Sequence, residues 1–205
     1  AELTAAVKNC NVIIHCAAYA APFGNKKRFF QTNVEGTKNV YKAGQQNSVS
    51  RIVMVSSASI FDRMNHDKPH TDETPQLKFR PKHHYGASKY DAELFCLSQP
   101  KDQWIGLRPR AVFGLGDQTL LPRLKRLIGK NNYRTIGNGE GLIDVTCLSN
   151  FVDAVCLAIE APESSLGKFY NISNGDPQTF NTIMQTYTDK LPGSYRQRKL
   201  PYWPI

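Results

Sequence analysis

The sequence lacks the long apolar runs and leader segments of membrane and secreted proteins. No stretch approaches the ~20 apolar residues that a membrane-spanning helix needs. The chain shows no signal peptide, although it begins with Ala1 rather than Met and opens on what looks like the middle of a helix. We therefore expect a cytoplasmic protein without a membrane span. The lack of a signal peptide adds little to this expectation.

Cysteine pairs and metal-ligand spacings are also missing. The five cysteines form no Cys-x-x-Cys pair, and several sit in apolar runs, so we expect buried free thiols in a reducing compartment. One polar segment holds four histidines without the spacing of metal ligands, namely His66, His70, His83 and His84. The sequence thus predicts neither a disulfide scaffold nor a metal site.

The charge is strongly positive, but no nucleic-acid-binding motif accompanies it. The chain has 26 Lys and Arg residues against 17 Asp and Glu residues, a formal charge of +9. The basic residues are spread over 26–28, 78–82, 123–130 and 196–199. Such a spread is typical of a basic surface that can attract an anionic cofactor, so we expect no nucleic-acid partner.

What the sequence does contain is a series of buried strands that alternate with helices. Asn11–Cys16, Arg51–Ser57 and Trp104–Leu107 are near-continuous apolar runs, as strands covered on both faces should be. Helical segments at about 25–46 and 84–98 separate them. This alternation predicts an α/β fold with a parallel sheet, in which ligands sit at the carboxyl ends of the strands.

After Gly116 the pattern changes to shorter elements. We expect helices at about 119–129, 149–159 and 179–191, and strands near 133–136, 142–148 and 169–172. Residues 58–83 read as a long loop, and the glycine cluster at 137–141 reads as a turn before a strand. The second part therefore reads as a smaller α+β lobe, and the 192–205 tail shows no clear ending.

Tyr85 and Lys89 carry the strongest chemical signal. In a helix over 84–98 they lie one turn apart on one face, and Ser56-Ser57 ends an apolar strand. An ammonium beside a phenol lowers the pKa of the phenol from its ordinary ~10, and a serine hydroxyl can hold a substrate oxygen. Ser56, Ser57 and Ser59 are the candidates for that hydroxyl. The set suits hydride transfer at a carbinol or carbonyl carbon.

Other polar residues have several interpretations. His15 lies inside an apolar strand and is expected to be a core histidine with a hydrogen-bond partner. Arg108 is expected to anchor a strand end, whereas Arg110 can meet a substrate carboxylate. His83 and His84 can line a substrate entrance beside Tyr85 or belong to an ordinary loop, and the sequence leaves both open.

Six blocks in order resemble the extended short-chain dehydrogenase/reductase superfamily, the NAD-dependent epimerase/dehydratase enzymes. They are IIHCAA at 13–18, NVEGTKNV at 33–40, VSSAS at 55–59, YGASK at 85–89, LRPRAVFG at 107–114 and GLIDVTCLSNFVDA at 141–154. Within it the chain looks most like the 3β-hydroxysteroid dehydrogenase and sterol-4-carboxylate 3-dehydrogenase branch, which includes bacterial reductases of β-keto acids.

The resemblance implies two domains with different roles. Residues 1–116 match part of a Rossmann-type dinucleotide-binding domain with flanking helices, and 117–205 match mainly a substrate-binding lobe. The catalytic positions implied are Ser57, Tyr85 and Lys89. The cofactor contacts implied are Cys16, Ala17, Ala18, Asn33, Tyr85, Lys89, Pro109, Ala111 and Val112. The substrate contacts expected are Ser59, His84 and Arg110.

One departure from the family is large. The family begins with a strand, a G-x-x-G-x-x-G phosphate loop and a residue that reads the adenosine ribose, and none of these precedes Asn11. The chain therefore resembles the middle and later part of a longer enzyme. We expect these 205 residues alone to bind a dinucleotide weakly or not at all, and the choice between NAD and NADP stays open.

The function implied is an NAD(P)-dependent oxidoreductase acting on a hydrophobic alcohol or ketone, sterol-like or β-keto acid-like, with a homodimer as an allowed assembly. One alternative is a nucleotide-sugar epimerase or dehydratase, which usually carries an Arg where this chain has Leu142-Ile143. The other is a non-catalytic dinucleotide sensor of the same fold. Such sensors typically lose the Tyr or Lys that this chain keeps.

Overall fold

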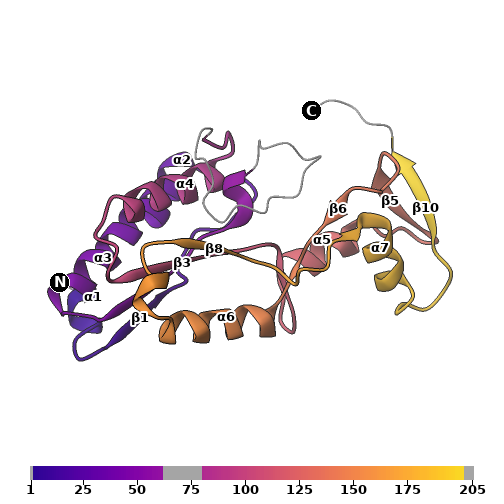
Figure 1. The fold of residues 1–205 in the computed structure, drawn as a ribbon. Helices are drawn as coiled ribbons and strands as arrows, with labels where there is room; N and C mark the ends of the chain where they lie inside the picture. The colour runs from indigo at the N-terminus through magenta and orange to yellow at the C-terminus, as the bar shows by residue number, and fades with distance from the viewer. Residues whose placement is uncertain (1, 62–79, 201–205) are drawn as a thin grey trace. The chain divides into compact units, whose positions relative to one another are not determined.

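A computed structural model describes residues 2–61 and 80–200, which divide into two compact units (Figure 1). The first unit comprises the residues up to Arg110 together with Val152–Ile172. The second comprises Ala111–Phe151 and the residues from Ser173 onward. The chain therefore leaves the first unit after Arg110 and returns to it for about twenty residues.

The first unit is built on a four-stranded sheet in the order β1-β2-β3-β8, with every neighbouring pair parallel. Its strands are β1 (Val12–His15), β2 (Arg51–Val55), β3 (Trp104–Pro109) and β8 (Phe169–Ile172). The central strand β2 is buried on both faces, because Ile52 and Val53 are both 0 % exposed. The parallel α/β sheet predicted from the apolar runs is confirmed.

Helices flank this sheet. They are α1 (Glu2–Ala6), α2 (Lys26–Phe30), the π-helical turn Gln31–Glu35, α3 (Gly36–Gln46), the 3₁₀ turn Ala58–Phe61, α4 (His84–Leu97), α6 (Leu148–Glu160) and the 3₁₀ turn Glu163–Ser165. In Figure 1, α3 and α4 lie on one face of the sheet and α6 lies on the other. The single helix predicted over 25–46 is thus three consecutive segments with a π-turn in the middle.

Two contacts show how closely the helices approach the sheet. A Cβ atom on Gly44 of α3 would lie 2.7 Å from the Ile52 side chain, so the lack of one lets the helix backbone approach β2. On the other face, the Arg51 guanidinium donates to the carbonyls of Ala158, Ile159 and Ala161 at 2.8–3.1 Å. These bonds satisfy carbonyls at the end of α6 that have no partner within the helix.

The second unit contains short, separate pairs of strands and two helices. Strand β5 (Asn132–Ile136) pairs in parallel with β10 (Arg196–Leu200), β4 (Val112–Phe113) with β7 (Thr146–Cys147), and β6 (Leu142–Ile143) pairs antiparallel with β9 (Gln178–Thr179). The helices are α5 (Leu120–Arg126) and α7 (Phe180–Thr188). Leu124, Tyr133 and Met184 form its buried core.

Several expectations can be compared with these elements. The glycine cluster is a turn between β5 and β6, with Gly137 and Gly139 at φ 65° and 75°. The expected boundary at Gly116 differs from the division found, because residues 152–172 return to the first unit. Which unit serves cofactor and which serves substrate stays a prediction. Most of the expected loop at 58–83, with His66 and His70, lies outside the described residues.

The expectation of several buried thiols is wrong. All five cysteines are free, but only Cys96 is buried, and Cys10, Cys16 and Cys156 are exposed. Cys10 and Cys16 lie just beyond the two ends of β1, where the sheet no longer covers them. Within the described residues, no helix is long and apolar enough to cross a membrane, and no group of His, Cys, Asp and Glu is arranged to hold a metal ion.

Candidate active site

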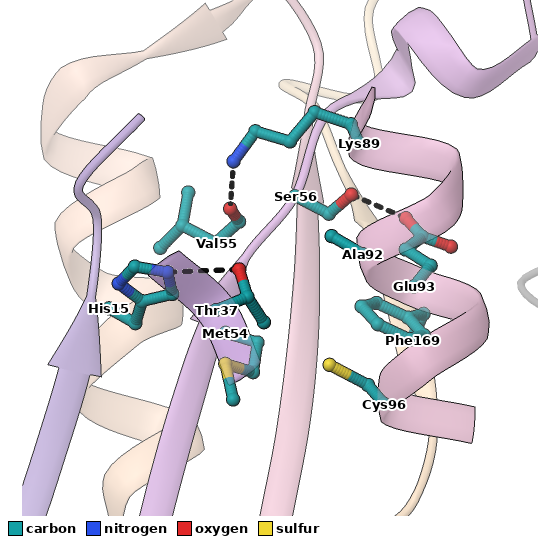
Figure 2. Close-up of a pocket in the computed structure, with 10 residues that line it drawn as sticks. All are labelled: His15, Thr37, Met54, Val55, Ser56, Lys89, Ala92, Glu93, Cys96 and Phe169. Carbon is teal, nitrogen blue, oxygen red and sulfur yellow. Dashed lines mark hydrogen bonds between the residues drawn. The ribbon is translucent and has the colours of Figure 1, made fainter. Parts of the chain in front are cut away.

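Lys89 is buried at the carboxyl end of the sheet of the first unit. It is 6 % exposed, and its ammonium donates to the carbonyl oxygen of Val55, the last residue of β2, at 2.8 Å (Figure 2). Burial lowers the pKa of Lys89 to about 8, and the negative charge of Glu93 opposes that shift. The side chain is therefore a cation at neutral pH that a small change in its surroundings can discharge.

Tyr85 and Ser57 form a hydrogen-bonded pair beside this lysine. Burial raises the pKa of Tyr85, and the hydrogen bond with Ser57 opposes the rise only in part. The spacing of Tyr85 and Lys89 predicts the opposite, a lowered pKa for Tyr85. The difference arises because burial disfavours the phenolate, while the ammonium that is expected to stabilise it donates to the Val55 carbonyl. Ser57 also lies 2.9 Å, oxygen to oxygen, from the Ser59 hydroxyl.

A buried ion pair lies directly behind these groups. Glu93 and Arg108 are each 1 % exposed, and the Arg108 Nε and Nη2 atoms donate to the Glu93 carboxylate at 2.9 and 2.7 Å. The Ser56 hydroxyl donates to the same carboxylate. Arg108 thus anchors the end of β3 by binding α4, as the sequence predicts for a structural arginine.

His15 is a core histidine with a polar partner, as expected. It is 7 % exposed, and its Nε2 atom lies 3.1 Å from the Thr37 hydroxyl oxygen. Thr37 gives its own proton to the Asn33 carbonyl at 2.7 Å, so the histidine must be the donor in the first bond. His15, Thr37, Lys89 and Glu93 all line one small cavity of about 20 Å³ between the sheet and the helices (Figure 2).

Asn33 connects the segment after β1 to the helix that carries Tyr85. It is 1 % exposed in the π-helical turn. Its amide accepts from the Tyr19 backbone N–H at 2.7 Å and donates to the Tyr19 carbonyl at 3.2 Å and to the Ser88 hydroxyl at 2.9 Å. Ser88 in turn donates to the Tyr85 carbonyl. This is the geometry that a residue steadying the strand end would need.

The small residues expected beside a cofactor follow β1 directly. Cys16 and Ala17 are exposed and Ala18 is half-buried. Cys16 is close enough to Lys89 for the ammonium to lower its thiol pKa, although burial raises that pKa by more. The chain thus has a stretch of short side chains after β1, and the first of them lies near the lysine.

The remaining predicted positions fall in different places. Pro109 ends β3 and is half-buried, and Arg110 after it is exposed. Ala111 and Val112 begin the second unit, where the Ala111 carbonyl accepts from the Thr146 N–H at 3.3 Å. His84 is exposed at the start of α4, with its ring centroid 6.1 Å from that of the buried Phe29. The first unit brings Ser57, Ser59, Tyr85 and Lys89 together.

Two buried polar residues of this site, Thr37 and Glu93, are not among the site residues that the sequence predicts. A signal for Glu93 exists, since Tyr85, Lys89 and Glu93 follow one another at intervals of four residues and residues four apart share a helix face. No comparable signal points to Thr37, because its partner His15 is distant in the sequence.

Comparison with protein families gives one match over nearly the whole chain. The 3-beta hydroxysteroid dehydrogenase/isomerase family matches residues 1–201. The human sterol-4-alpha-carboxylate 3-dehydrogenase (decarboxylating) is 31% identical over 211 residues, which cover 98% of this chain and 56% of that protein. The 2-alkyl-3-oxoalkanoate reductase of Stenotrophomonas maltophilia is 33% identical over 180 residues, 84% of this chain and 54% of that protein. The chain therefore spans about half the length of these relatives.

Solved structures show the same fold at lower identity. A UDP-glucuronic acid 4-epimerase from Bacillus cereus in complex with NAD has a TM-score of 0.80 at 18% identity, covering 99% of this chain and 66% of that one. A dTDP-glucose 4,6-dehydratase double mutant from Streptomyces venezuelae with NAD and DAU bound has a TM-score of 0.79 at 20% identity, covering 100% and 67%. The fold is thus that of the extended short-chain dehydrogenase/reductase proteins.

Proposed function

Because the chain belongs to the 3-beta hydroxysteroid dehydrogenase/isomerase family, we propose that the protein is an NAD(P)-dependent oxidoreductase. It transfers a hydride to or from a carbon that bears a hydroxyl or keto group, on a hydrophobic substrate that is sterol-like or β-keto acid-like. The activities for which the relatives are named support that substrate class. The observation that carries the proposal is the Ser57–Tyr85 hydrogen bond beside the buried Lys89.

The residues of the first unit fit a nicotinamide cofactor in their chemistry. An ammonium has three N–H donors, and one of those on Lys89 goes to Val55, which leaves donor capacity of the kind that ribose hydroxyls accept. Cys16, the first of the short side chains Cys16, Ala17 and Ala18, lies close enough to interact with this ammonium. When bound, the nicotinamide supplies or accepts the hydride.

The chain's own residues handle the proton. Ser57 donates a hydrogen bond to the substrate oxygen and so holds it at the Tyr85 hydroxyl. In oxidation Tyr85, as phenolate, takes the proton from the substrate hydroxyl, and in reduction it returns a proton to the forming alkoxide. Lys89, one helical turn away, supplies a positive charge while it is protonated, and this charge stabilises the negative charge that passes between the two oxygens.

A Tyr85→Phe variant tests this assignment. We expect the full-length protein to lose about 10²–10⁴-fold in turnover, because the variant keeps the ring and loses only the group that moves the proton. Nicotinamide absorbance with sterol and β-keto acid substrates measures the rate. Tyr187→Phe, which removes a hydroxyl on α7 in the second unit, is the matched control and should keep its rate. A Tyr85→Phe protein with near-wild-type turnover would show that another group moves the proton.

A nucleotide-sugar epimerase or dehydratase is the competing reaction, and the structures of the same fold include such enzymes. The exposed apolar Leu142 on β6, 65 % accessible, supports an apolar substrate over a diphosphate sugar. Incubation with UDP- and dTDP-sugars separates the two, since our proposal expects no conversion. A non-catalytic dinucleotide sensor would bind NAD(P) but convert none of the sterol, β-keto acid or nucleotide-sugar substrates.

A cytoplasmic location, a homodimer and the absence of a nucleic-acid partner are further parts of this proposal. Cell fractionation of the full-length protein, its mass in solution and a nucleic-acid retention assay check them in turn. We expect the cytosolic fraction, twice the chain mass and no retention.

A further inference from the structure

The buried Glu93–Arg108 pair is a costly feature that the proposed proton transfer does not use. Both side chains are 1 % exposed, and the guanidinium lies 5.6 and 4.8 Å from the ring centroids of Phe61 and Phe169. Removing two charges from water costs several kcal/mol per ion, and apolar residues of equal volume often stabilise a fold as well or better. Stability alone therefore does not require a charged pair here, even though each partner needs the other once both are buried.

The position of Glu93 links it to both halves of the candidate site. It follows Lys89 by one helical turn on α4, as Lys89 follows Tyr85. It also accepts the hydroxyl proton of Ser56, the residue directly before Ser57. One carboxylate thus binds the side chain next to Ser57 and lines the same cavity as the Lys89 side chain.

We propose that Glu93, held by Arg108, is a positioning residue of the candidate site. Through the Ser56 hydroxyl it fixes the end of β2 so that Ser57 meets Tyr85, and through its charge it keeps the buried Lys89 cationic. The inference rests on the proposed function for its catalytic meaning. Its electrostatic claim can be tested without turnover.

The electrostatic half depends on the groups around Lys89, and these include the Tyr85 phenol one helical turn before it on α4. Burial raises the pKa of Glu93, and the hydrogen bonds and charge of Arg108 and the hydrogen bond from Ser56 oppose that rise and favour the carboxylate. Burial and the carboxylate of Glu93 act on the ammonium in opposite directions, and the sulfurs of Cys16 and Cys96 act weakly in the same direction as Glu93. His15 on β1 faces the ammonium as a neutral ring. Arg108 on β3 is a second cation bound to Glu93. Removing the negative charge of Glu93 would take away the largest effect that opposes burial at Lys89, which favours deprotonation of the lysine.

The first experiment measures the titration of Lys89 directly. In full-length protein with ¹³C-labelled lysine side chains, the Lys89 resonance is assigned from its loss in Lys89→Met and followed by NMR from pH 6 to 11. We expect a midpoint near pH 8 in the wild type, as burial implies. In Glu93→Gln, which keeps the shape and loses the charge, we expect the midpoint to fall by about one unit or more.

Two further variants separate charge from structure. Glu93→Asp keeps the charge and should hold the midpoint within about half a unit of the wild type, which is well below the change expected on loss of an opposite charge. Glu160→Gln removes an exposed carboxylate at the end of α6 and should change nothing. An unchanged midpoint in Glu93→Gln, or an equal fall in Glu93→Asp, would overturn the electrostatic half.

Turnover tests the positioning half and keeps it apart from the proposed function. Ser56→Ala removes only the hydroxyl that reaches Glu93, and we expect kcat to fall about tenfold, the free-energy equivalent of one hydrogen bond, with KM within twofold. An unchanged kcat in Ser56→Ala would overturn the positioning half. The same result would overturn it even if Glu93→Gln failed to fold, because Ser56→Ala does not depend on that variant. A protein with no dehydrogenase activity but a Lys89 midpoint that depends on Glu93 refutes the proposed function alone.

Discussion

The pKa of the buried His15 depends on the residues that surround it. Burial and the positive charge of Lys89 lower its pKa to about 4, which keeps the ring neutral at pH 7, and its hydrogen bond to Thr37 places the proton on Nε2. An imidazole in the unfolded chain titrates near ~6.5. The two states of the protein therefore bind different numbers of protons between these values.

This difference predicts an acid-sensitive fold. Below pH 6.5 His15 binds a proton in the unfolded chain, whereas in the folded protein it binds one only below about pH 4. The free energy of unfolding therefore falls as the pH falls from 6.5 to about 4. The loss attributable to His15 is ~3 kcal/mol. Urea unfolding at pH 7.5 and pH 4.5 measures it in the wild type and in His15→Gln. The variant should lose less over the same interval, and equal losses would show that His15 is not responsible.

At the level of single residues, the sequence predicts types of environment better than it predicts partners. It identifies His15 as a core residue and Arg108 as an anchor, because each polar side chain interrupts or ends an apolar strand. It gives the wrong direction for the pKa of Tyr85, since burial depends on how helix and sheet pack and not on the four-residue spacing. Glu93 is missed for the same reason.

Strand β3 contains a glycine whose lack of a side chain is required by its neighbour. A Cβ atom on Gly106 would lie 2.0 Å from the Phe169 ring, which itself covers the Arg108 guanidinium. Gly106→Ala must therefore displace a packed aromatic ring, and we expect a loss of about 1–3 kcal/mol in the free energy of unfolding. Denaturant titration followed by circular dichroism measures this loss.

Gly36, the first residue of α3, provides the matched control for this substitution. A Cβ atom there comes no closer than 3.9 Å to its neighbours, so Gly36→Ala should be neutral or stabilise the protein by up to about 1 kcal/mol. If both variants lost the same stability, the contact with Phe169 would not be the cause.

The elements that the sequence predicts are those with a clear apolar period. The strand expected at 169–172 agrees with β8, and the helix expected over 84–98 agrees with α4 to within one residue. Strand β10 has no such signal, because Arg196–Leu200 is mostly charged and only partly buried. The π-helical turn at Gln31–Glu35 is likewise invisible, since one extra residue in a turn hardly disturbs the periodicity.

On the scale of the whole molecule, the printed chain contains the candidate acid/base group but no glycine-rich loop ahead of β1. Pyrophosphate contacts in this fold come from such a loop and the helix that follows it. We therefore expect the isolated 205 residues to bind NAD and NADP with dissociation constants weaker than millimolar. Isothermal titration calorimetry of this segment measures them, and a low-micromolar constant for either dinucleotide would contradict the expectation.

The return of the chain to the first unit has a consequence for the order in which the protein folds. Strand β3 ends at Pro109, yet its partner β8 (Phe169–Ile172) is synthesised only after Ala111–Phe151 of the second unit. Contacts between segments so distant in the chain form slowly, because the intervening loop must close first. Until then the ring of Phe169 is absent and the buried charge of Arg108 lacks one of its aromatic neighbours. During synthesis, the emerging first unit carries its complete Ser–Tyr–Lys set before it can complete the sheet that supports it.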